Sequence, residues 1–248
     1  MKRRKPASSE RDEGSLGGRA NAGTEAVVNR NDRRRRRTRT MILEAADRMF
    51  HRMGVDNASV SHITEEADVA YGSFYNHFKS LDDVVSALAE ASLQRVAERT
   101  GMILEKAERV ELLPCVGARV IMRTLWQDPA IRWLLGRPYV LVAEFKKAAV
   151  PFMVSAEQGA VKSGRLKPAG GHKAWLTMYP WMLIAELNAL VETGDLLAHE
   201  ERFARVSLRF LGIDDALAPD LIKRSRTLVM ESGMLEPERS HSATRRKS

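Results

Sequence analysis

The chain has 248 residues, of which 44% are hydrophobic, so its length suits one large or two small domains with a sizeable core. It contains no run of about 18 apolar residues that could span a bilayer, and no apolar stretch follows the basic N-terminus as in a secretory signal. Cys115 is the single cysteine, which excludes an internal disulfide and a metal site built from several cysteines. We expect a cytoplasmic protein with Cys115 in its core.

The positive charge is concentrated at the N-terminal end. Residues 1–40 contain 13 Lys and Arg against 5 Asp and Glu, which accounts for the whole net charge of +8. This distribution favours a polyanionic partner at that end, with double-stranded DNA as the first candidate. We expect residues 1–37 to form a basic disordered arm, of which residues 1–30 are a solvated tail. For the arginine run from Arg33 to Arg37, DNA contact and simple solvation both stay open.

The segment after the arm has the periodicity of short helices. Apolar residues recur at intervals of three and four from Ile42 to Met53, and Gly54 follows as a helix C-cap. Ser59 is a suitable N-cap for a second, short helix, which ends at Asp68. Both helices are predicted to bury one apolar face.

A third short helix is expected over residues 71–77, three residues after the second. Phe74 and Phe78 would lie on its inner side and leave the polar side chains for other surfaces. Ser80, followed three residues later by Asp83, resembles a capping box and predicts the start of a long fourth helix.

The rest of the chain also has helical spacing, which predicts an all-α protein. Asp128 and Pro129 have the pattern of a helix N-terminus, and this short helix should end near Gly136. The next helix should run from Pro138 to about residue 164, and Pro151 should kink or split it.

The last third of the chain contains three further predicted helices. Residues 172–193 are apolar nearly all round, which predicts burial on two sides, with a bend at Pro180. Two final helices are expected at about residues 200–211 and 218–230. The polar residues 236–248 are expected to be disordered.

Two short helices joined by a three-residue turn are typical of a helix-turn-helix, whose second helix enters the major groove of DNA. Outward residues on that helix must be short and polar, and Gly72 lets the backbone approach closely. Tyr75, His77 and Lys79 can offer donors to phosphates. The candidate DNA-binding residues are Arg39, Ser59, Gly72, Ser73, Tyr75, Asn76, His77 and Lys79.

The stretch TRTMILEAADRMFHRMGVDNASVSHITEEADVAYGSFYNHFKS, which begins at Thr38, resembles the DNA-binding region of the tetracycline-repressor (TetR) family. The resemblance covers about residues 38–85, and the C-terminal part matches only loosely. It implies a homodimeric, all-α repressor. Its C-terminal domain would bind a small effector and dimerise through the last two long helices.

Three positions depart from the family pattern. The turn glycine of the family is Asp68 here, which tolerates left-handed backbone better than most residues. The usual Ser or Thr N-cap of the recognition helix is Ala70, which removes a cap worth about 1 kcal/mol. A commonly found lysine is Leu81. We hypothesise that the arginine run compensates for the lost phosphate contacts.

The predicted organisation is an N-terminal three-helix helix-turn-helix DNA-binding domain over residues 38–85, followed by a larger helical effector-binding and dimerisation domain over residues 86–232. Residues 233–248 would form a disordered tail. The two-fold dimer should use residues 172–193 together with residues 200–211, because the former segment is apolar on more faces than one core needs.

Aromatic residues in the larger domain favour an apolar cavity for a small hydrophobic effector. Glu186 lies on an otherwise apolar helical stripe, and pairing with an arginine is the favoured interpretation over a direct role in orienting the ligand. The candidate effector-binding residues are Trp126, Trp133, Phe145, Phe152, Trp175, Tyr179, Met182 and Glu186.

Other function classes have little support. The six histidines lack the spacing of a metal site, so we expect no bound metal. No nucleophile elbow, P-loop or dinucleotide motif is present, so we expect no cofactor and no enzymatic activity. The favoured function is a ligand-responsive transcriptional regulator, a repressor that binds a palindromic operator as a homodimer. The alternative is an effector-independent architectural DNA-binding protein, against which the large apolar C-terminal part argues.

Overall fold

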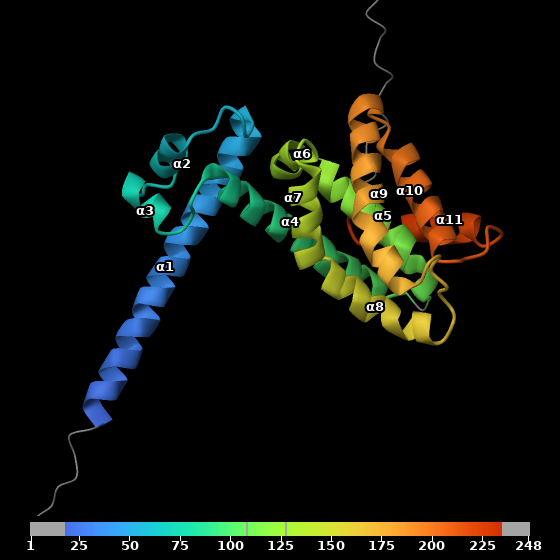
Figure 1. Ribbon diagram of the computed structural model, residues 1–248, viewed down its shortest axis with the longest axis horizontal. Coiled ribbons are helices and arrows are strands. Elements are labelled where there is room, and N and C mark those ends of the chain that lie inside the picture. Colours follow the sequence, from blue (N-terminus) through green and yellow to red (C-terminus); the bar gives the residue numbers. More distant parts are fainter. Residues whose placement is uncertain (1–17, 108, 127, 235–248) are drawn as a thin grey trace, which may run out of the picture.

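The computed structural model describes residues 18–107, 109–126 and 128–234, with side chains from residue 31 onward. These residues form eleven α-helices, one short 3₁₀ helix and no strand, which confirms the predicted all-α class. The helices divide into a small N-terminal group and a larger body (Figure 1). None of the described helices is both long and apolar enough to cross a membrane.

Helix α2, Val60–Glu66, begins directly after Ser59 as the sequence predicts and ends two residues before Asp68. The hydroxyl of Ser59 accepts a hydrogen bond from the backbone N–H of His62 at 3.2 Å and so caps the helix. In the turn that follows, Asp68 has a φ of 53°, the left-handed conformation for which glycine is the usual residue. Asp68 therefore adopts the backbone conformation expected for the family's glycine.

Helix α3, Tyr71–Tyr75, is the second helix of the helix-turn-helix and is two residues shorter than expected. It has no side-chain cap because Ala70 occupies the N-cap position. Phe74 and Phe78 are both buried, as predicted, with ring centroids 5.7 Å apart. These two rings fix the inner side of α3 and leave its outer side exposed.

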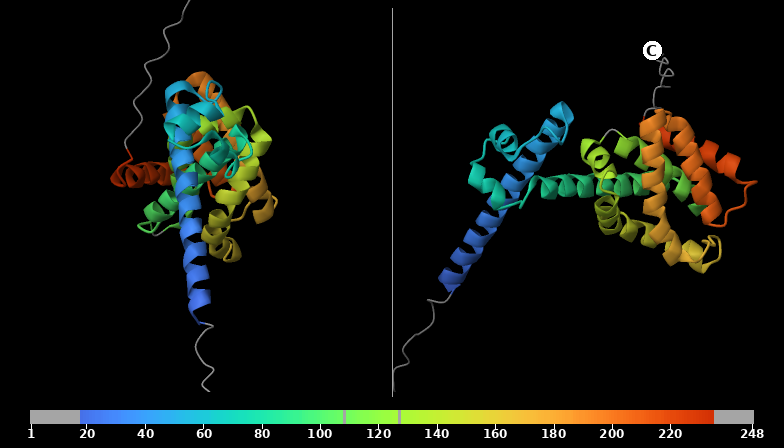
Figure 2. Two further views of the ribbon diagram at one scale, coloured as in Figure 1. Left: turned by 90° about the vertical axis from the view of Figure 1, so that its left-hand side faces the viewer. Right: turned by 45° about the horizontal axis from the view of Figure 1, so that its top comes forward.

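Helix α1, Gly18–Met53, is longer than the sequence predicts and contains the arginine run. Residues 18–37 are helical, whereas we expected a disordered arm, of which residues 1–17 lie outside the described residues. Arginine is a good helix former, and no Gly or Pro interrupts the chain between Gly23 and Gly54. As a result α1 extends well beyond α2 and α3 (Figure 2).

Helix α4, Leu81–Leu104, connects the N-terminal group to the body, as the right-hand view of Figure 2 shows. Its cap confirms the prediction, because the Ser80 hydroxyl accepts a hydrogen bond from the backbone N–H of Asp83 at 3.3 Å. The domain boundary expected near residue 85 falls inside α4. One continuous helix therefore belongs to both halves of the molecule.

Seven further α-helices build the body, with α5 packed against α4, α10 and α11. Cys115 lies in α5 and is fully buried, as predicted. The helices are α5 Leu113–Trp126, α6 Pro129–Leu135, α7 Pro138–Ala148, α8 Val150–Lys162, α9 His172–Thr193, α10 Leu196–Phe210 and α11 Ala218–Glu231, with the 3₁₀ turn Val110–Leu112 before α5.

Capping residues and prolines set several of these helix ends. Asp128 caps α6, and Pro151 marks the break between α7 and α8, because proline has no N–H to continue the ladder. Helix α9 has the predicted bounds and contains Pro180. Helix α10 begins earlier than expected, since Asp195 accepts a hydrogen bond from the backbone N–H of Ala198 at 3.1 Å. The expected tail, residues 236–248, lies outside the described residues.

A buried ion cluster joins α5 to α10. Glu200 accepts hydrogen bonds from Arg119 at 2.8 Å and from Arg123 at 2.6 Å. Arg119 also donates to the Ser225 hydroxyl of α11 at 3.1 Å. The cluster therefore fixes the mutual positions of the three helices.

Candidate DNA-binding surface and effector cavity

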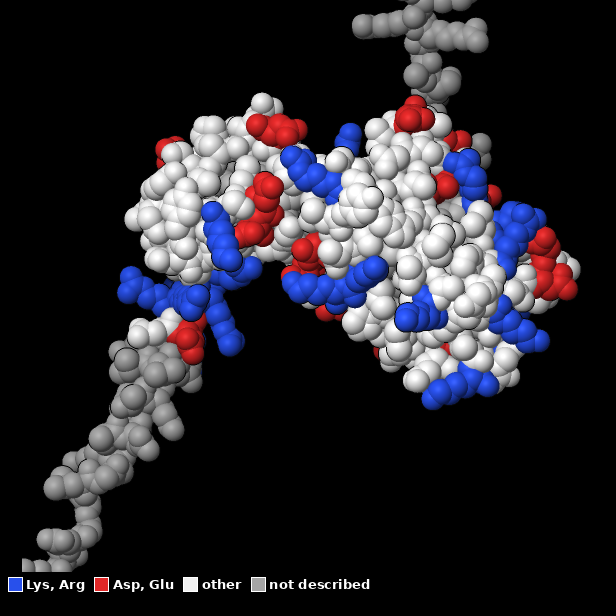
Figure 3. All heavy atoms as spheres, viewed as in Figure 1, with Lys and Arg blue, Asp and Glu red and all other residues white. Residues whose placement is uncertain are grey.

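A polar groove lies between α1 and α3. The α1 residues that line it recur at intervals of three, one and three, so they share one face of the helix. Figure 3 shows Lys and Arg side chains gathered over this part of α1. The groove is lined by Asn31, Arg34, Arg35, Thr38, Ser73, Asn76 and His77.

The outer side of α3 is exposed and carries two tyrosines. Tyr71 is 53% exposed and Tyr75 is 51% exposed, and their hydroxyl oxygens lie 3.1 Å apart. An added Cβ at Gly72 would meet nothing within 4 Å, so packing inside the protein does not require glycine there. The expectation that Gly72 allows close approach to DNA stays a prediction.

Arg39 connects α1 to the end of α3. Its guanidinium donates a hydrogen bond to the backbone carbonyl of His77 at 3.1 Å and lies 4.2 Å from the centre of the Phe78 ring. Burial lowers the pKa of His77, and the nearby charges of Arg35 and Arg39 lower it further. Both effects favour the neutral form of the imidazole.

Two other predicted DNA-binding residues also have local structural contacts. The hydroxyl of Ser59 is used as the cap of α2. The backbone N–H of Lys79 donates to the carboxylate of Asp83 at 2.8 Å, while the lysine side chain is exposed beyond the end of α3. Lys79 therefore has its ammonium available to solvent or to DNA.

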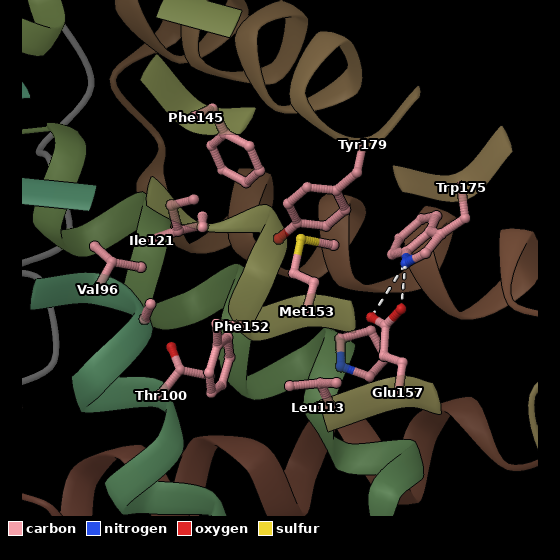
Figure 4. Close-up of a pocket in the computed structure, with 14 residues that line it drawn as sticks. Val96, Thr100, Leu113, Ile121, Phe145, Phe152, Met153, Glu157, Trp175 and Tyr179 are labelled. Atoms are coloured by element: carbon pink, nitrogen blue, oxygen red, sulfur yellow. Dashed lines mark hydrogen bonds between the residues drawn. The ribbon is translucent and has the colours of Figure 1, made fainter. Parts of the chain in front are cut away.

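The body encloses an apolar cavity between α4, α5, α7, α8 and α9 (Figure 4). The space within its lining is about 430 Å³, including the open side. It is lined by Val96, Ala97, Thr100, Leu113, Pro114, Gly117, Ile121, Phe145, Ala149, Phe152, Met153, Glu157, Trp175 and Tyr179.

Glu157 places a buried carboxylate in the cavity wall. It accepts hydrogen bonds from Trp175 Nε1 at 3.1 Å on Oε1 and at 3.0 Å on Oε2, and His172 Nε2 lies within hydrogen-bond distance of Oε2 at 2.8 Å. Burial raises the pKa of the Glu157 carboxyl, and the hydrogen bonds from His172 and Trp175 oppose this shift. Both carboxylate oxygens therefore have protein partners.

Half of the predicted effector-binding residues meet in this cavity. Phe145, Phe152, Trp175 and Tyr179 line it, whereas the other four lie elsewhere. Trp126 and Met182 are partly buried against the hydrophobic core. Trp133 donates a hydrogen bond to Asp56 in the N-terminal group. Met182 and Glu186 share the helical spacing of Trp175 and Tyr179 on α9 but do not line the cavity.

Glu186 is paired, as the favoured interpretation expected. Its carboxylate lies 2.6 Å from His199 Nδ1 and 2.7 Å from Arg202 Nη2, both on α10. The side chain of His199 is itself buried. Glu186 thus belongs to the contact between α9 and α10 and not to the cavity.

Sequence reasoning missed several residues at both sites. On α1 the signal was present, because Asn31, Arg34, Arg35 and Thr38 have the spacing of one helix face. Glu157 gave no comparable signal, because its partner His172 lies 15 positions away on another helix.

The N-terminal region matches known regulators. Residues 42–88 match the family model described as bacterial regulatory proteins, tetR family. The HTH-type transcriptional regulator TtgR of Pseudomonas putida is 32% identical over 90 residues, which are 36% of this chain and 42% of that protein. The HTH-type transcriptional regulator AcrR of Shigella flexneri is 38% identical over 61 residues, 25% of this chain and 28% of that protein. The matched segments thus span less than half of these curated relatives.

Solved structures resemble more of the chain. RolR in complex with resorcinol has a TM-score of 0.69 and 21% identity, over 78% of this chain and 96% of that one. SmeT, the repressor of the Stenotrophomonas maltophilia multidrug efflux pump SmeDEF, has a TM-score of 0.52 and 21% identity, over 69% of this chain and 88% of that one. These likenesses show the fold, and the sequence match shows that residues 42–88 carry the helix-turn-helix region of the tetR family of bacterial regulatory proteins.

Proposed function

We propose that this protein is a ligand-responsive transcriptional repressor that binds a palindromic operator as a homodimer and is released by a small hydrophobic effector. The observation that carries the proposal is that α4 runs from the helix-turn-helix to the cavity. This helix starts directly after the helix-turn-helix and supplies Val96, Ala97 and Thr100 to the cavity wall. A helix of this length carries a displacement at the cavity over about 30 Å to the recognition helix.

DNA would lie against the outer side of α3 and the groove beside α1. Ser73 and Asn76 would contact bases, whereas Tyr75, His77, Lys79 and the arginines of α1 would contact phosphates. Side-chain size supports this division, since short polar side chains suit the floor of the major groove and longer ones can reach the phosphates.

Dimerisation would use α9 and α10. Both helices expose large apolar side chains, namely Met178 and Val191 on α9 and Val206 on α10. A second copy related by a two-fold axis would cover them and would place two recognition helices on one face of DNA.

We assign residues 38–85 to DNA binding and residues 86–232 to effector binding and dimerisation. We place the protein in the cytoplasm with its DNA.

The effector would occupy the cavity between α4 and α9. The aromatic and aliphatic lining suits a small apolar molecule. RolR, whose structure contains resorcinol, offers a precedent for a ligand of one ring within this fold. An architectural DNA-binding protein would not need such a cavity, so we favour a regulator over that alternative.

A DNA titration tests the proposal. The full chain should bind one sequence far more tightly than random DNA, and hydrophobic compounds that raise its melting temperature should weaken that binding. Binding that depends steeply on salt but not on sequence, and that no compound affects, would favour the architectural alternative.

A further inference from the structure

Two hydroxyl groups at the cavity have no hydrogen-bond partner among the described residues. Thr100 is 3% exposed, and its Oγ1 atom is buried without a partner. Tyr179 is 5% exposed, and none of the hydrogen bonds of the described residues involves its hydroxyl. Burying a hydroxyl without a partner is unfavourable. A molecule that fills the cavity can supply the missing bonds.

The position of the Tyr179 hydroxyl is well defined. Its ring centroid lies 4.9 Å from that of Trp175, 5.6 Å from Phe145 and 5.2 Å from Phe203, so the ring is packed on several sides. The hydroxyl points into the cavity (Figure 4). An added Cβ at Gly117 would lie 3.9 Å from its oxygen, so glycine on α5 leaves the space beside it free.

The charges at the cavity disfavour an anionic ligand. Among the described lining residues, Glu157 is the only charged one. A groove outside, which shares the Phe152 side chain with the cavity, carries Glu98 and Glu105 and no basic residue among those described. An anion would therefore meet like charges on its way in and would find no cation inside.

A cationic ligand is also disfavoured, for a different reason. The Glu157 carboxylate already accepts hydrogen bonds from Trp175 and shares a hydrogen bond with His172. It therefore has no need of a cationic partner from a ligand. The groups without partners are the neutral hydroxyls of Thr100 and Tyr179. A neutral hydroxyl on the ligand can both donate to one of them and accept from the other.

We propose that the cavity binds a small neutral aromatic molecule carrying at least one hydroxyl group, a phenol in the simplest case. Its ring lies among Phe145, Phe152 and Met153, and its hydroxyl lies between Thr100 and Tyr179. Phe152 separates the cavity from the outer groove, so its side chain moves when the ligand enters. The regulatory meaning of this site rests on the proposed function, but the binding itself does not.

Calorimetric titration of the full chain tests the ligand class with four molecules of similar size: phenol, toluene, benzoate and benzylammonium. Phenol should bind about tenfold more tightly than toluene, because two buried hydrogen bonds add to the same ring contacts. Benzoate and benzylammonium should bind more weakly than phenol. The proposal is overturned if either ion binds as tightly as phenol, if toluene equals phenol, or if none of the four binds.

Two variants locate the hydroxyl contacts. Thr100→Val keeps the side-chain shape and Tyr179→Phe keeps the ring, so each should lower the affinity for phenol about fivefold without lowering that for toluene. Thr100→Ser keeps the hydroxyl and should retain the preference for phenol. The matched controls are Thr177→Val and Tyr139→Phe, both exposed, and they should not change binding. Unchanged phenol preference in both cavity variants would contradict the assignment.

Adding DNA to the same titrations separates this inference from the proposed function. If phenol binds as expected but leaves DNA affinity unchanged, the ligand class is correct and the regulatory proposal is wrong. If benzylammonium or benzoate, and not phenol, releases the DNA, the regulatory proposal is correct and the ligand class is wrong.

Discussion

The indole of Trp133 in α6 donates a hydrogen bond to the carboxylate of Asp56, in the turn between α1 and α2, at 2.8 Å. The guanidinium of Arg137 lies 3.5 Å from the centre of the same indole, which restricts its orientation. The body therefore touches the DNA-binding region at this turn as well as through α4. Such a second contact fixes the angle between the two parts.

Trp133→Phe removes the indole donor and should loosen this turn. A single hydrogen bond contributes about 1 kcal/mol, so the amides of residues 54–59 should exchange their hydrogens about fivefold faster. Hydrogen exchange read by mass spectrometry measures this change. Trp126→Phe, which changes a partly buried tryptophan at the end of α5, is the matched control. Unchanged exchange in Trp133→Phe would show that α4 alone sets the orientation.

The groove arginines should contribute to the salt dependence of DNA binding. Arg34→Ala combined with Arg35→Ala removes the two basic side chains that line the groove, and should reduce the slope of log affinity against log salt by about 2. Arg36→Ala combined with Arg37→Ala removes the same charge from other faces of α1 and should have a smaller effect. Equal effects of the two pairs would mean that only the total charge of α1 matters.

His77 should make DNA binding depend on pH. Its pKa in the free protein lies below the ordinary value of about 6.5, because of burial and of Arg35 and Arg39. A neighbouring phosphate favours the protonated ring and raises the pKa in the complex. The complex then binds more protons than the free protein, so affinity should rise as pH falls through the interval between the two pKa values.

The control for this prediction is His77→Gln, which should flatten the pH dependence measured by fluorescence anisotropy with labelled DNA. An equally steep dependence in this variant would assign the effect to another histidine, of which His62 on α2 is exposed and nearest in sequence.

Glu200→Gln should destabilise the body strongly. It removes the negative charge between two buried arginines, Arg119 and Arg123, and leaving buried charge uncompensated costs about 3–5 kcal/mol. The free energy of unfolding from urea titration measures the loss. Glu201→Gln, whose side chain is 47% exposed, should cost well under 1 kcal/mol. Equal losses for the two variants would argue against a role for the buried cluster.

The helix-turn-helix could be predicted from the sequence because its signals are local. The caps Ser59 and Ser80 and the buried pair Phe74 and Phe78 act within a few positions of the helices they define. The length of α1 was missed because a basic, polar segment favours disorder by composition, although arginine also favours helix.

The cavity could be predicted only in part because five helices contribute to its lining. Helical spacing placed Trp175, Tyr179 and Glu186 on one stripe, but it does not tell which part of a stripe faces a cavity and which part faces α10. Glu157 and Thr100 became candidates only when the packing of α4 against α7 and α8 against α9 was known.

Selection of bound sites from random double-stranded DNA tests the central claim, that α3 reads DNA as part of a two-fold dimer, most directly. The full chain should enrich a palindrome whose half-sites are separated by about one helical turn, or by a multiple of it. Asn76→Ala should alter the preferred bases in both half-sites together. Enrichment of a single unrepeated site, or of no sequence at all, would contradict the account.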